Sequence, residues 1–393
     1  MLPSVLVGFY SNPEHISPLT DSIDLLSNEF RVIVVARDVG NFNYKYPSNV
    51  SLFKIGPHCE MSKYNMPFYK KLFSFLSFIL KLFILIRREK PSILFLYDTN
   101  AYIAGWLASR PFRNIPIFYH QSDPVLLSEI PKNYFSYFAK CLELNVVRSA
   151  DVLSFTDPYN AKLFLDDAKL KIKKEVIIVE NCTCKLINIP KMSYEMQKIK
   201  DSGKQIIIHR GPVGSGVNLR PAVRSIKYWP DNSVLVLLGL IANRQIELCR
   251  NVVQQEGFLD RVILVPYLPT REELLGYTVS ADIGLILYKI KKEGMKYWGP
   301  TKLYDYIACG IPVIAPKEMI FVDEIIKRHE IGLTFESDSP EVIGKTIRHL
   351  LEQPALLQKM RDNARKIHLS ELNYETQFEP LLKKIKNVIG DCS

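Results

Sequence analysis

The chain has 393 residues, of which 47% are hydrophobic and 23% are charged, a composition that excludes disordered and collagen-like classes. This length predicts two domains, each large enough to bury its own core. The 51 Lys and Arg residues against 41 Asp and Glu residues give a net charge of +10. That charge favours anionic partners without choosing among nucleic acid, a nucleotide-sugar and an anionic membrane surface.

In the first half of the chain, short apolar runs flanked by turn residues alternate with helical patterns. The expected strands are 4–9, 31–36, 92–97, 115–119, 152–155 and 175–181, and the expected helices are 19–29, 67–88 and 134–150. Strands that alternate with helices indicate βαβ units and a mostly parallel sheet.

A polar, Lys-rich stretch at 189–204 interrupts the alternation, and we interpret it as a linker. The pattern then restarts. The expected strands of the second half are 205–209, 233–239, 261–265, 283–287 and 312–315. The fold class is therefore α/β, with two doubly wound domains in tandem, and ligands are expected outside the carboxyl ends of the strands.

Cysteine usage and hydropathy argue against export and against a membrane span. Seven Cys, an odd number in a long chain without a recognisable signal peptide, indicate a reducing compartment. The longest apolar stretch, 72–86, has 15 residues. It would reach about 22 Å across a hydrocarbon core of about 30 Å. We expect a cytoplasmic protein.

A glycine-rich turn, His209-Arg-Gly-Pro-Val-Gly-Ser-Gly216, follows the first strand of the second half and precedes a helix that begins near 219. Glycines such as Gly211 and Gly216 let backbone N–H groups approach an anion, and the next helix start adds its positive dipole end. Arg210 is the most suitable charged group. A phosphate or sugar contact and a plain strand-to-helix turn both remain open.

The segment 298–314 is the most informative stretch. Pro300 after Gly299 predicts a helix start, where the N–H groups of Thr301 to Leu303 point outward. Lys302 adds a positive charge, which completes a cradle for a diphosphate.

Asp305 lies four residues after Thr301, and so on nearly the same helix face. A carboxylate there could accept hydrogen bonds from two ribose hydroxyls.

The run from Pro300 to Ile314 resembles the P-x-K-x-x-E-Y-x-A-x-G-x-P-V-I signature of group 1 (family 4) glycosyltransferases, which have the GT-B fold. The segments 149–154, 179–181, 209–231 and 260–285 resemble further parts of that family in the same order. The resemblance implies two Rossmann-like domains that face each other across a cleft. We expect an acceptor-side domain at 1–195, a nucleotide-sugar domain at 196–370 and a C-terminal helix at 371–393 that packs back toward the first domain.

The resemblance also implies roles for individual residues. Arg210 would contact the diphosphate, Lys302 would hold phosphate and Asp305 would hold the ribose. Tyr297 stands at the donor site where the family often has the first of two acidic residues, which grips the donor sugar. No D-x-D occurs in the chain, so we expect neither a metal nor another cofactor.

In the first half, His120 follows a strand at the place where the family has a His near the donor sugar, so it is a candidate catalytic residue. A loop His that bonds locally is the alternative. His15 and Asp123 are candidate acceptor-side residues.

The helix expected at 67–90 combines aromatic and basic residues. That combination suits an anionic membrane surface, although a buried crossover helix would have a similar composition.

Together these features predict a retaining glycosyltransferase at the inner face of the membrane. It would move a hexose-type sugar from a UDP- or GDP-sugar to a hydroxyl of a lipid-linked glycan in cell-surface polysaccharide synthesis. A nonhydrolysing nucleotide-sugar epimerase and a catalytically inert scaffold at the membrane are the alternatives. We do not expect a nucleic-acid partner, because no recognised binding motif accompanies the charge.

Overall fold

The computed structural model describes residues 2–59, 67–112, 115–132, 134–169, 175–214, 216–240, 243–268 and 270–391. The chain forms two compact units. The first consists of Met1–Glu180 with Gln377–Ser393, and the second of Asn181–Thr376. The division expected from the sequence is at 195, and the expected start of the returning C-terminal segment is at 371.

The first unit is built on a parallel sheet, to which the described residues contribute seven strands in the order β3-β2-β1-β4-β5-β6-β7. The strands are β1 (Ser4–Phe9), β2 (Arg31–Val39), β3 (Val50–Cys59), β4 (Ile93–Tyr97), β5 (Ile117–Gln121), β6 (Val152–Phe155) and β7 (Val176–Ile178). The central strands are buried on both faces, which is why they read as continuous apolar runs.

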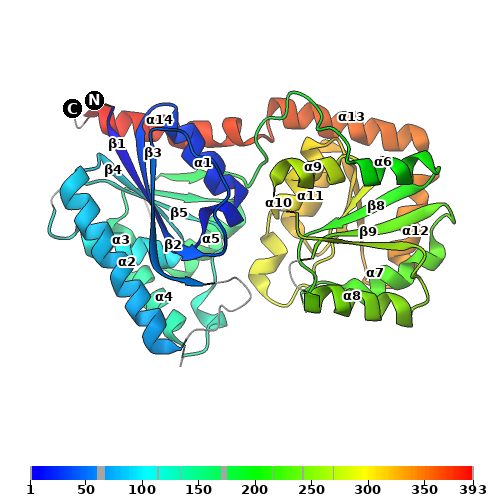
Figure 1. Cartoon of the computed structure of the whole chain (residues 1–393), viewed down its shortest axis with the longest axis horizontal. Coiled ribbons are helices and arrows are strands. Elements are labelled where there is room, and N and C mark those ends of the chain that lie inside the picture. The colour runs from blue at the N-terminus through cyan, green and yellow to red at the C-terminus, as the bar shows by residue number, and fades with distance from the viewer. Residues whose placement is uncertain are drawn as a thin grey trace. The chain divides into compact units, whose positions relative to one another are not determined.

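Helices cover both faces of this sheet (Figure 1). They are α1 (Ser17–Ser27), α2 (Phe68–Glu89), α3 (Asp98–Ser109), α4 (Phe135–Val146), α5 (Pro158–Asp167) and α14 (Tyr374–Asp391). Leu94 and Leu96 of β4 belong to the core cluster with α2, α3 and α5, whereas the Phe95 ring lies 6.3 Å from Phe378 of α14. Because side chains alternate along a strand, α14 covers the opposite face from α2.

The second unit repeats the architecture. Among the described residues, its parallel sheet has six strands in the order β10-β9-β8-β11-β12-β13. The strands are β8 (Gln205–Arg210), β9 (Ser233–Leu240), β10 (Val262–Pro266), β11 (Ile283–Leu285), β12 (Val313–Pro316) and β13 (Gly332–Phe335).

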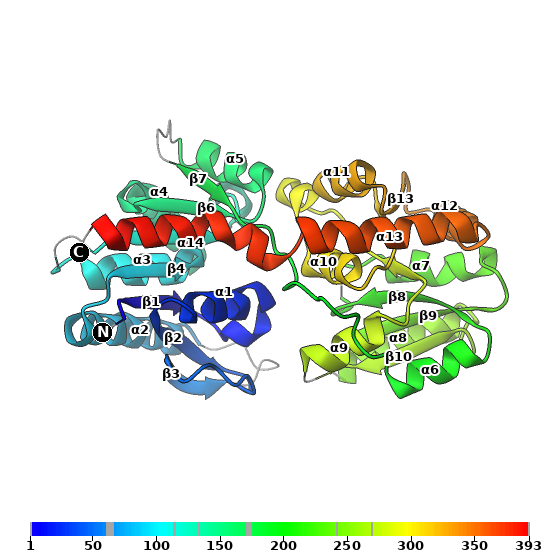
Figure 2. The same cartoon turned by 90° about the horizontal axis from the view of Figure 1, so that it is seen from above.

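The helices of the second unit are α6 (Tyr194–Asp201), α7 (Leu219–Ser225), α8 (Asn243–Gln255), α9 (Arg271–Thr278), α10 (Thr301–Ala308), α11 (Ile320–His329), α12 (Pro340–Leu351) and α13 (Pro354–Ser370). Figure 2 shows them distributed over both faces of the sheet. Side chains of α7, α8 and α12 form one core cluster with Ile283 and Leu285 of β11. Gly284, between those two residues, therefore faces the other side, where α10 lies.

Several elements differ from the sequence-based expectation, among them strand β13, which is not expected. The stretch 189–204, expected as an irregular linker, contains helix α6, whose Ser193 side chain accepts the Met196 N–H as an N-cap. Strand β3 is not among the expected strands, because this outermost strand of the sheet is only partly buried and Lys54, Gly56 and Pro57 interrupt its apolar residues.

The sequence predicts that the apolar run 72–86, which lies within helix α2, is too short to cross a bilayer. Over the part of the chain that the structure describes, neither α2 nor any other helix has the length and apolar character of a membrane span.

Candidate functional site

The predicted donor residues gather at the carboxyl end of β8, in the second unit. Arg210 is the last residue of that strand, and Lys302 and Asp305 lie on the first turns of α10. Both α10 side chains are buried, with 6% of Lys302 and 5% of Asp305 exposed. The structure thus brings together three residues that are up to 95 positions apart in sequence.

The Asp305 carboxylate is held from two directions. Its Oδ2 atom accepts a hydrogen bond from Nη1 of Arg210, within an ion pair. Its Oδ1 atom accepts one from Oγ1 of Thr183 at 2.6 Å. Thr183 is a site residue that sequence reasoning missed, because 122 positions separate it from Asp305.

Tyr306 ties the helix to the strands beneath it. Its hydroxyl accepts the Arg210 N–H at 3.1 Å and lies 3.1 Å from the Ile208 carbonyl oxygen, to which it donates. The ring passes over Gly284, where a Cβ atom would lie only 2.5 Å from ring carbons. Gly284 therefore allows α10 to pack this closely on β11.

Lys302 is a buried cation. Its Nζ atom lies 4.5 Å from the centre of the Tyr288 ring, and no carboxylate in the described residues pairs with it. Burial, and after it the positive charge of Arg210, lowers the pKa of Lys302 to about 7. An ammonium in this position lacks a counter-ion that an anionic ligand would supply.

Gly211 and Gly239 make room beside this cation. Gly211 has a φ of +101°, and a Cβ atom there would lie 3.5 Å from Lys302 Nζ. Gly239, with a φ of +92°, packs against the Gly211 backbone. The Gly211 N–H donates to the Leu238 carbonyl at 2.8 Å, so it contributes space to the site and not a hydrogen-bond donor. Gly216 ends the same turn, and its carbonyl accepts the Lys289 N–H at 2.9 Å.

The start of α10 offers fewer donors than expected. Pro300 is its N-cap, and the Leu303 N–H donates to the Pro300 carbonyl at 2.9 Å, so the prediction of a free N–H at Leu303 is wrong. The N–H groups of Thr301 and Lys302 have no backbone acceptor within the described residues. Gly299 precedes them, and a Cβ atom there would lie 2.8 Å from the Phe321 ring.

Tyr297 lies at the end of a short 3-10 helix, Glu293–Tyr297, and is half-buried.

His209, on β8, is fully buried, and its Nδ1 donates to the Leu285 carbonyl at 3.0 Å. Burial, and after it the charge of Lys302, holds the pKa of His209 well below its usual value. His209 is therefore a neutral core residue beside the site.

The first-unit candidates lie at or beyond the carboxyl ends of their strands. His120 is on β5 and buried, with Nδ1 3.0 Å from Ser154 Oγ, and burial lowers its pKa to about 3. Asp123 follows β5 and is exposed, and His15, at the end of a short 3-10 helix after β1, is also exposed.

The same edge carries two further acids that sequence reasoning did not select. Asp98 follows β4 with a φ of +61° and accepts the Ser122 N–H at 3.0 Å, and burial raises its pKa to about 7. Asp157 follows β6 and caps α5, and burial raises its pKa to about 6. The signal that could have found them is an Asp directly or shortly after a buried strand.

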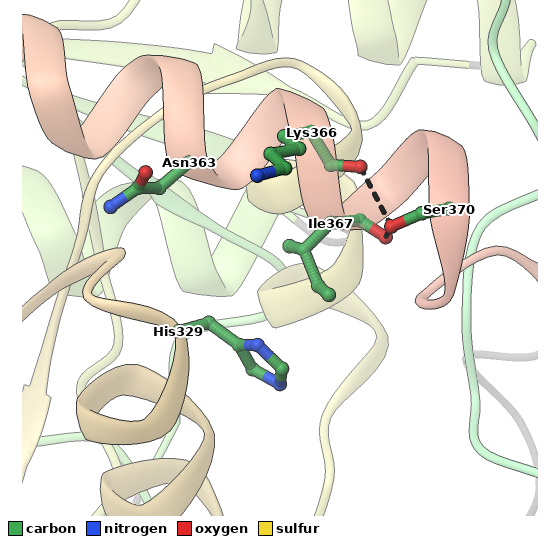
Figure 3. A pocket seen from close by; sticks show the side chains of 5 residues that line it. All are labelled: His329, Asn363, Lys366, Ile367 and Ser370. Carbon is green, nitrogen blue, oxygen red and sulfur yellow. Dashed lines mark hydrogen bonds between the residues drawn. The ribbon is translucent and has the colours of Figure 1, made fainter.

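Two other features bear on ligand-binding chemistry. Across the described residues, no group of three or more His, Cys, Asp or Glu side chains could hold a metal ion. A cavity of about 200 Å³ opens between α11 and α13 (Figure 3). It is lined by His329, Asn363, Lys366, Ile367 and Ser370. None of these side chains is buried, so the cavity lacks the buried polar groups that a ligand-binding site would have.

Comparison of the chain with known protein families and solved structures agrees with this architecture. Residues 199–367 match the model of the family glycosyl transferases group 1. No curated protein matches the chain by sequence.

Several solved structures share the fold. Sucrose-phosphate synthase from Thermosynechococcus elongatus is 14% identical with a TM-score of 0.77, and the match covers 99% of this chain and 100% of that one. Anabaena HepE in complex with UDP-glucose is 13% identical with a TM-score of 0.71, covering 98% and 99%. WaaG, a glycosyltransferase involved in lipopolysaccharide biosynthesis, is 12% identical with a TM-score of 0.68, covering 96% and 98%. The chain therefore has the GT-B fold.

The burial of Lys302 predicts a gain in stability when its charge is removed. The pKa of about 7 in the folded protein lies below the usual value of 10.5, so the unfolded chain holds this proton more tightly between those pH values. Lys302→Met should raise the free energy of unfolding of the ligand-free protein by about 1 to 3 kcal/mol at pH 6, and by less at pH 9. Urea denaturation at both pH values measures this difference.

The control is Lys317→Met, because Lys317 is exposed and pairs with an exposed Glu336. It should leave stability nearly unchanged at both pH values, since a solvent-exposed pair contributes little. An equal loss of stability at both pH values in Lys302→Met would show that the lysine side chain contributes packing and that its buried charge costs nothing.

Proposed function

We propose that this protein is a retaining glycosyltransferase of family 4. It transfers a hexose-type sugar from a UDP- or GDP-sugar to a hydroxyl of a lipid-linked glycan in cell-surface polysaccharide synthesis. The observation that carries the proposal is Lys302, a buried cation without a carboxylate partner among the described residues, beside two free N–H groups at the start of α10. The match to group 1 glycosyl transferases over this region and the UDP-glucose bound to HepE support it.

In this proposal the second unit binds the donor. Lys302, Arg210 and the N–H groups of Thr301 and Lys302 neutralise the diphosphate, and no metal is needed. Asp305 accepts hydrogen bonds from the ribose hydroxyls. Tyr297 and the turn with Gly211 and Gly216 border the donor.

The chemical step follows from this charge distribution. The bond between the anomeric carbon and the diphosphate oxygen breaks, and the charge that develops on the leaving phosphate is stabilised by Lys302 and Arg210. The acceptor hydroxyl forms the new bond from the same face of the sugar and gives its proton to the leaving phosphate oxygen. His120, as a neutral imidazole, would support the charge on the sugar ring, and His15 and Asp123 would contact the acceptor.

We also propose that α2 binds an anionic membrane surface at the inner face of the membrane. Its core face carries Phe75, Phe78, Leu82 and Leu85, which are buried. The outer face carries an apolar stripe of Tyr69, Phe73, Leu76, Leu80 and Ile84, each at least 45% exposed. The exposed cations Lys70, Lys71, Arg87 and Arg88 flank the stripe at its two ends. An apolar stripe with cations at both ends matches an interfacial helix on anionic lipid.

The donor assignment predicts nucleotide binding that depends on α10. UDP or GDP should stabilise the wild-type protein by about 2.7 kcal/mol at a hundred times its dissociation constant. Lys302→Ala and Asp305→Ala should each weaken that binding at least about tenfold, while Lys317→Ala should not. Thermal-shift titration with both nucleotides and their sugar conjugates measures this. A wild type that binds no nucleotide at millimolar concentration would favour an inert scaffold, and release of free or epimerised sugar without an acceptor would favour an epimerase.

Lys302 further predicts that binding takes up a proton. At pH 8 a group with a pKa of about 7 is mostly neutral, and a bound diphosphate favours the ammonium form. Affinity for UDP should therefore fall up to about tenfold per pH unit between pH 7 and pH 9. Calorimetry at pH 8 in buffers of different ionisation enthalpy counts the proton. Lys302→Arg, which stays charged, should bind without proton uptake, and the same uptake in this variant would contradict the assignment.

The apolar stripe predicts binding to anionic lipid. The protein should co-sediment with vesicles that contain phosphatidylglycerol and not with pure phosphatidylcholine vesicles, because both burial of the stripe and charge attraction contribute. Phe73→Glu with Leu80→Glu should reduce the bound fraction several-fold. Leu248→Glu is the control, since Leu248 is 45% exposed on α8 of the second unit. Equal binding of all three proteins would exclude α2 as the lipid contact.

A further inference from the structure

We infer that Thr183 is a positioning residue for nucleotide binding: its hydroxyl holds the Asp305 carboxylate in the orientation that accepts the two ribose hydroxyls. This inference rests on the proposed function, because it assigns Asp305 to the ribose. Thr183 lies in the segment that leads from β7 toward α6, outside every motif that the sequence presents.

The contact between the two side chains is short and protected from water. Oγ1 of Thr183 donates to Oδ1 of Asp305 at 2.6 Å, and only 2% of Thr183 and 5% of Asp305 are exposed. A hydrogen bond to a charged carboxylate in such surroundings is stronger than one between neutral groups at the surface. It can therefore fix the carboxylate plane.

The backbone around Thr183 is itself fixed, so its hydroxyl cannot simply follow a moving carboxylate. The Thr183 carbonyl accepts the Tyr374 N–H at 3.0 Å. The Lys185 N–H donates to Glu375 Oε2 at 2.7 Å, and the Leu186 N–H donates to His368 Nε2 at 2.9 Å. These bonds anchor the segment on both sides of the α13–α14 turn.

The hydrogen-bond capacity of Asp305 shows why this anchor matters. An ionised carboxylate has about two acceptor positions on each oxygen. Among the described residues, Thr183 uses one position on Oδ1 and Arg210 uses one on Oδ2, which leaves one position on each oxygen for the 2′- and 3′-hydroxyls of a ribose.

Arg210 is also a competitor for those positions. A guanidinium has five donors in a planar fork, and a carboxylate that can rotate forms a bidentate pair with it. In the structure, one nitrogen of Arg210 bonds one oxygen of Asp305, and Thr183 occupies the other oxygen. Loss of the Thr183 hydroxyl would let Asp305 rotate into a bidentate pair with Arg210, which would occupy the acceptor positions that the ribose hydroxyls need.

The test compares UDP with 2′,3′-dideoxyuridine diphosphate, by calorimetry on the wild type, Thr183→Val and Thr183→Ser. Thr183→Val keeps the side-chain shape without the hydroxyl, and we expect it to weaken UDP binding about tenfold. Thr183→Ser restores the hydroxyl and should bind UDP as the wild type does. The dideoxy ligand, which lacks both ribose hydroxyls, should lose much less affinity in Thr183→Val than UDP loses.

The controls separate positioning from folding. Thr346→Val removes a half-buried hydroxyl that bonds Val342 within α12, far along the chain from the site, and should leave both affinities unchanged. If Thr183→Val does not fold, Thr183→Ala takes its place, since the ratio of the two ligand affinities does not depend on the amount of active protein.

The outcomes distinguish this inference from the proposed function. If UDP and the dideoxy ligand both bind the wild type and Thr183→Val weakens them equally, or weakens neither, Thr183 does not act through the ribose. The donor assignment then stands without it. If neither UDP nor GDP binds the wild type, the proposed function fails and this inference fails with it.

Discussion

The ion pair between Arg210 and Asp305 is the interaction on which the candidate site depends. Two charges taken out of water are unfavourable unless each finds a partner, and here the partners come from the end of β8 and the first turns of α10. Their pairing, with the Tyr306 hydroxyl on the Arg210 amide, fixes the helix start relative to the strand. The other contacts that we propose with the nucleotide-sugar, including those of the Thr301 and Lys302 N–H groups, depend on this placement of the helix.

Lys302 follows a different logic, because it lies next to this pair and has no such partner among the described residues. A buried apolar side chain would serve the ligand-free fold better, so the lysine is best explained by what it binds. Burial, and after it the positive charge of Arg210, lowers the pKa of Lys302, and within the described residues Asp305 pairs with Arg210 and not with Lys302. In the function that we propose, a diphosphate would bring the missing negative charge, so the site would be complete only with its ligand.

The sequence predicts those elements of the fold whose residues form a recognisable pattern within a few positions of one another. Strands buried on both faces appear as apolar runs, and Gly299-Pro300 is enough to predict the start of α10, the helix that carries Lys302 and Asp305. The same pattern misses β3, whose exposed edge leaves no apolar run, and the short β13. It also misses Thr183, since a hydrogen bond across 122 positions leaves no local signature. The prediction of a free N–H at Leu303 is wrong for a geometric reason, because this N–H donates to the Pro300 carbonyl within the first turn of α10.

Helix α2 shows where pattern alone reaches its limit. Its aromatic residues are spread around much of the helix, so the sequence leaves a buried crossover helix and an interfacial helix as equal alternatives. The structure assigns Phe78 and Leu82 to the core and leaves Phe73 and Leu80 exposed, so the helix has a buried apolar face and an exposed apolar stripe. A stripe of large apolar side chains in contact with water is unfavourable, and a surface that retains one generally has a partner. Because exposed cations stand at both ends of the stripe and its middle is apolar, the anionic lipid surface that we propose would satisfy both parts at once.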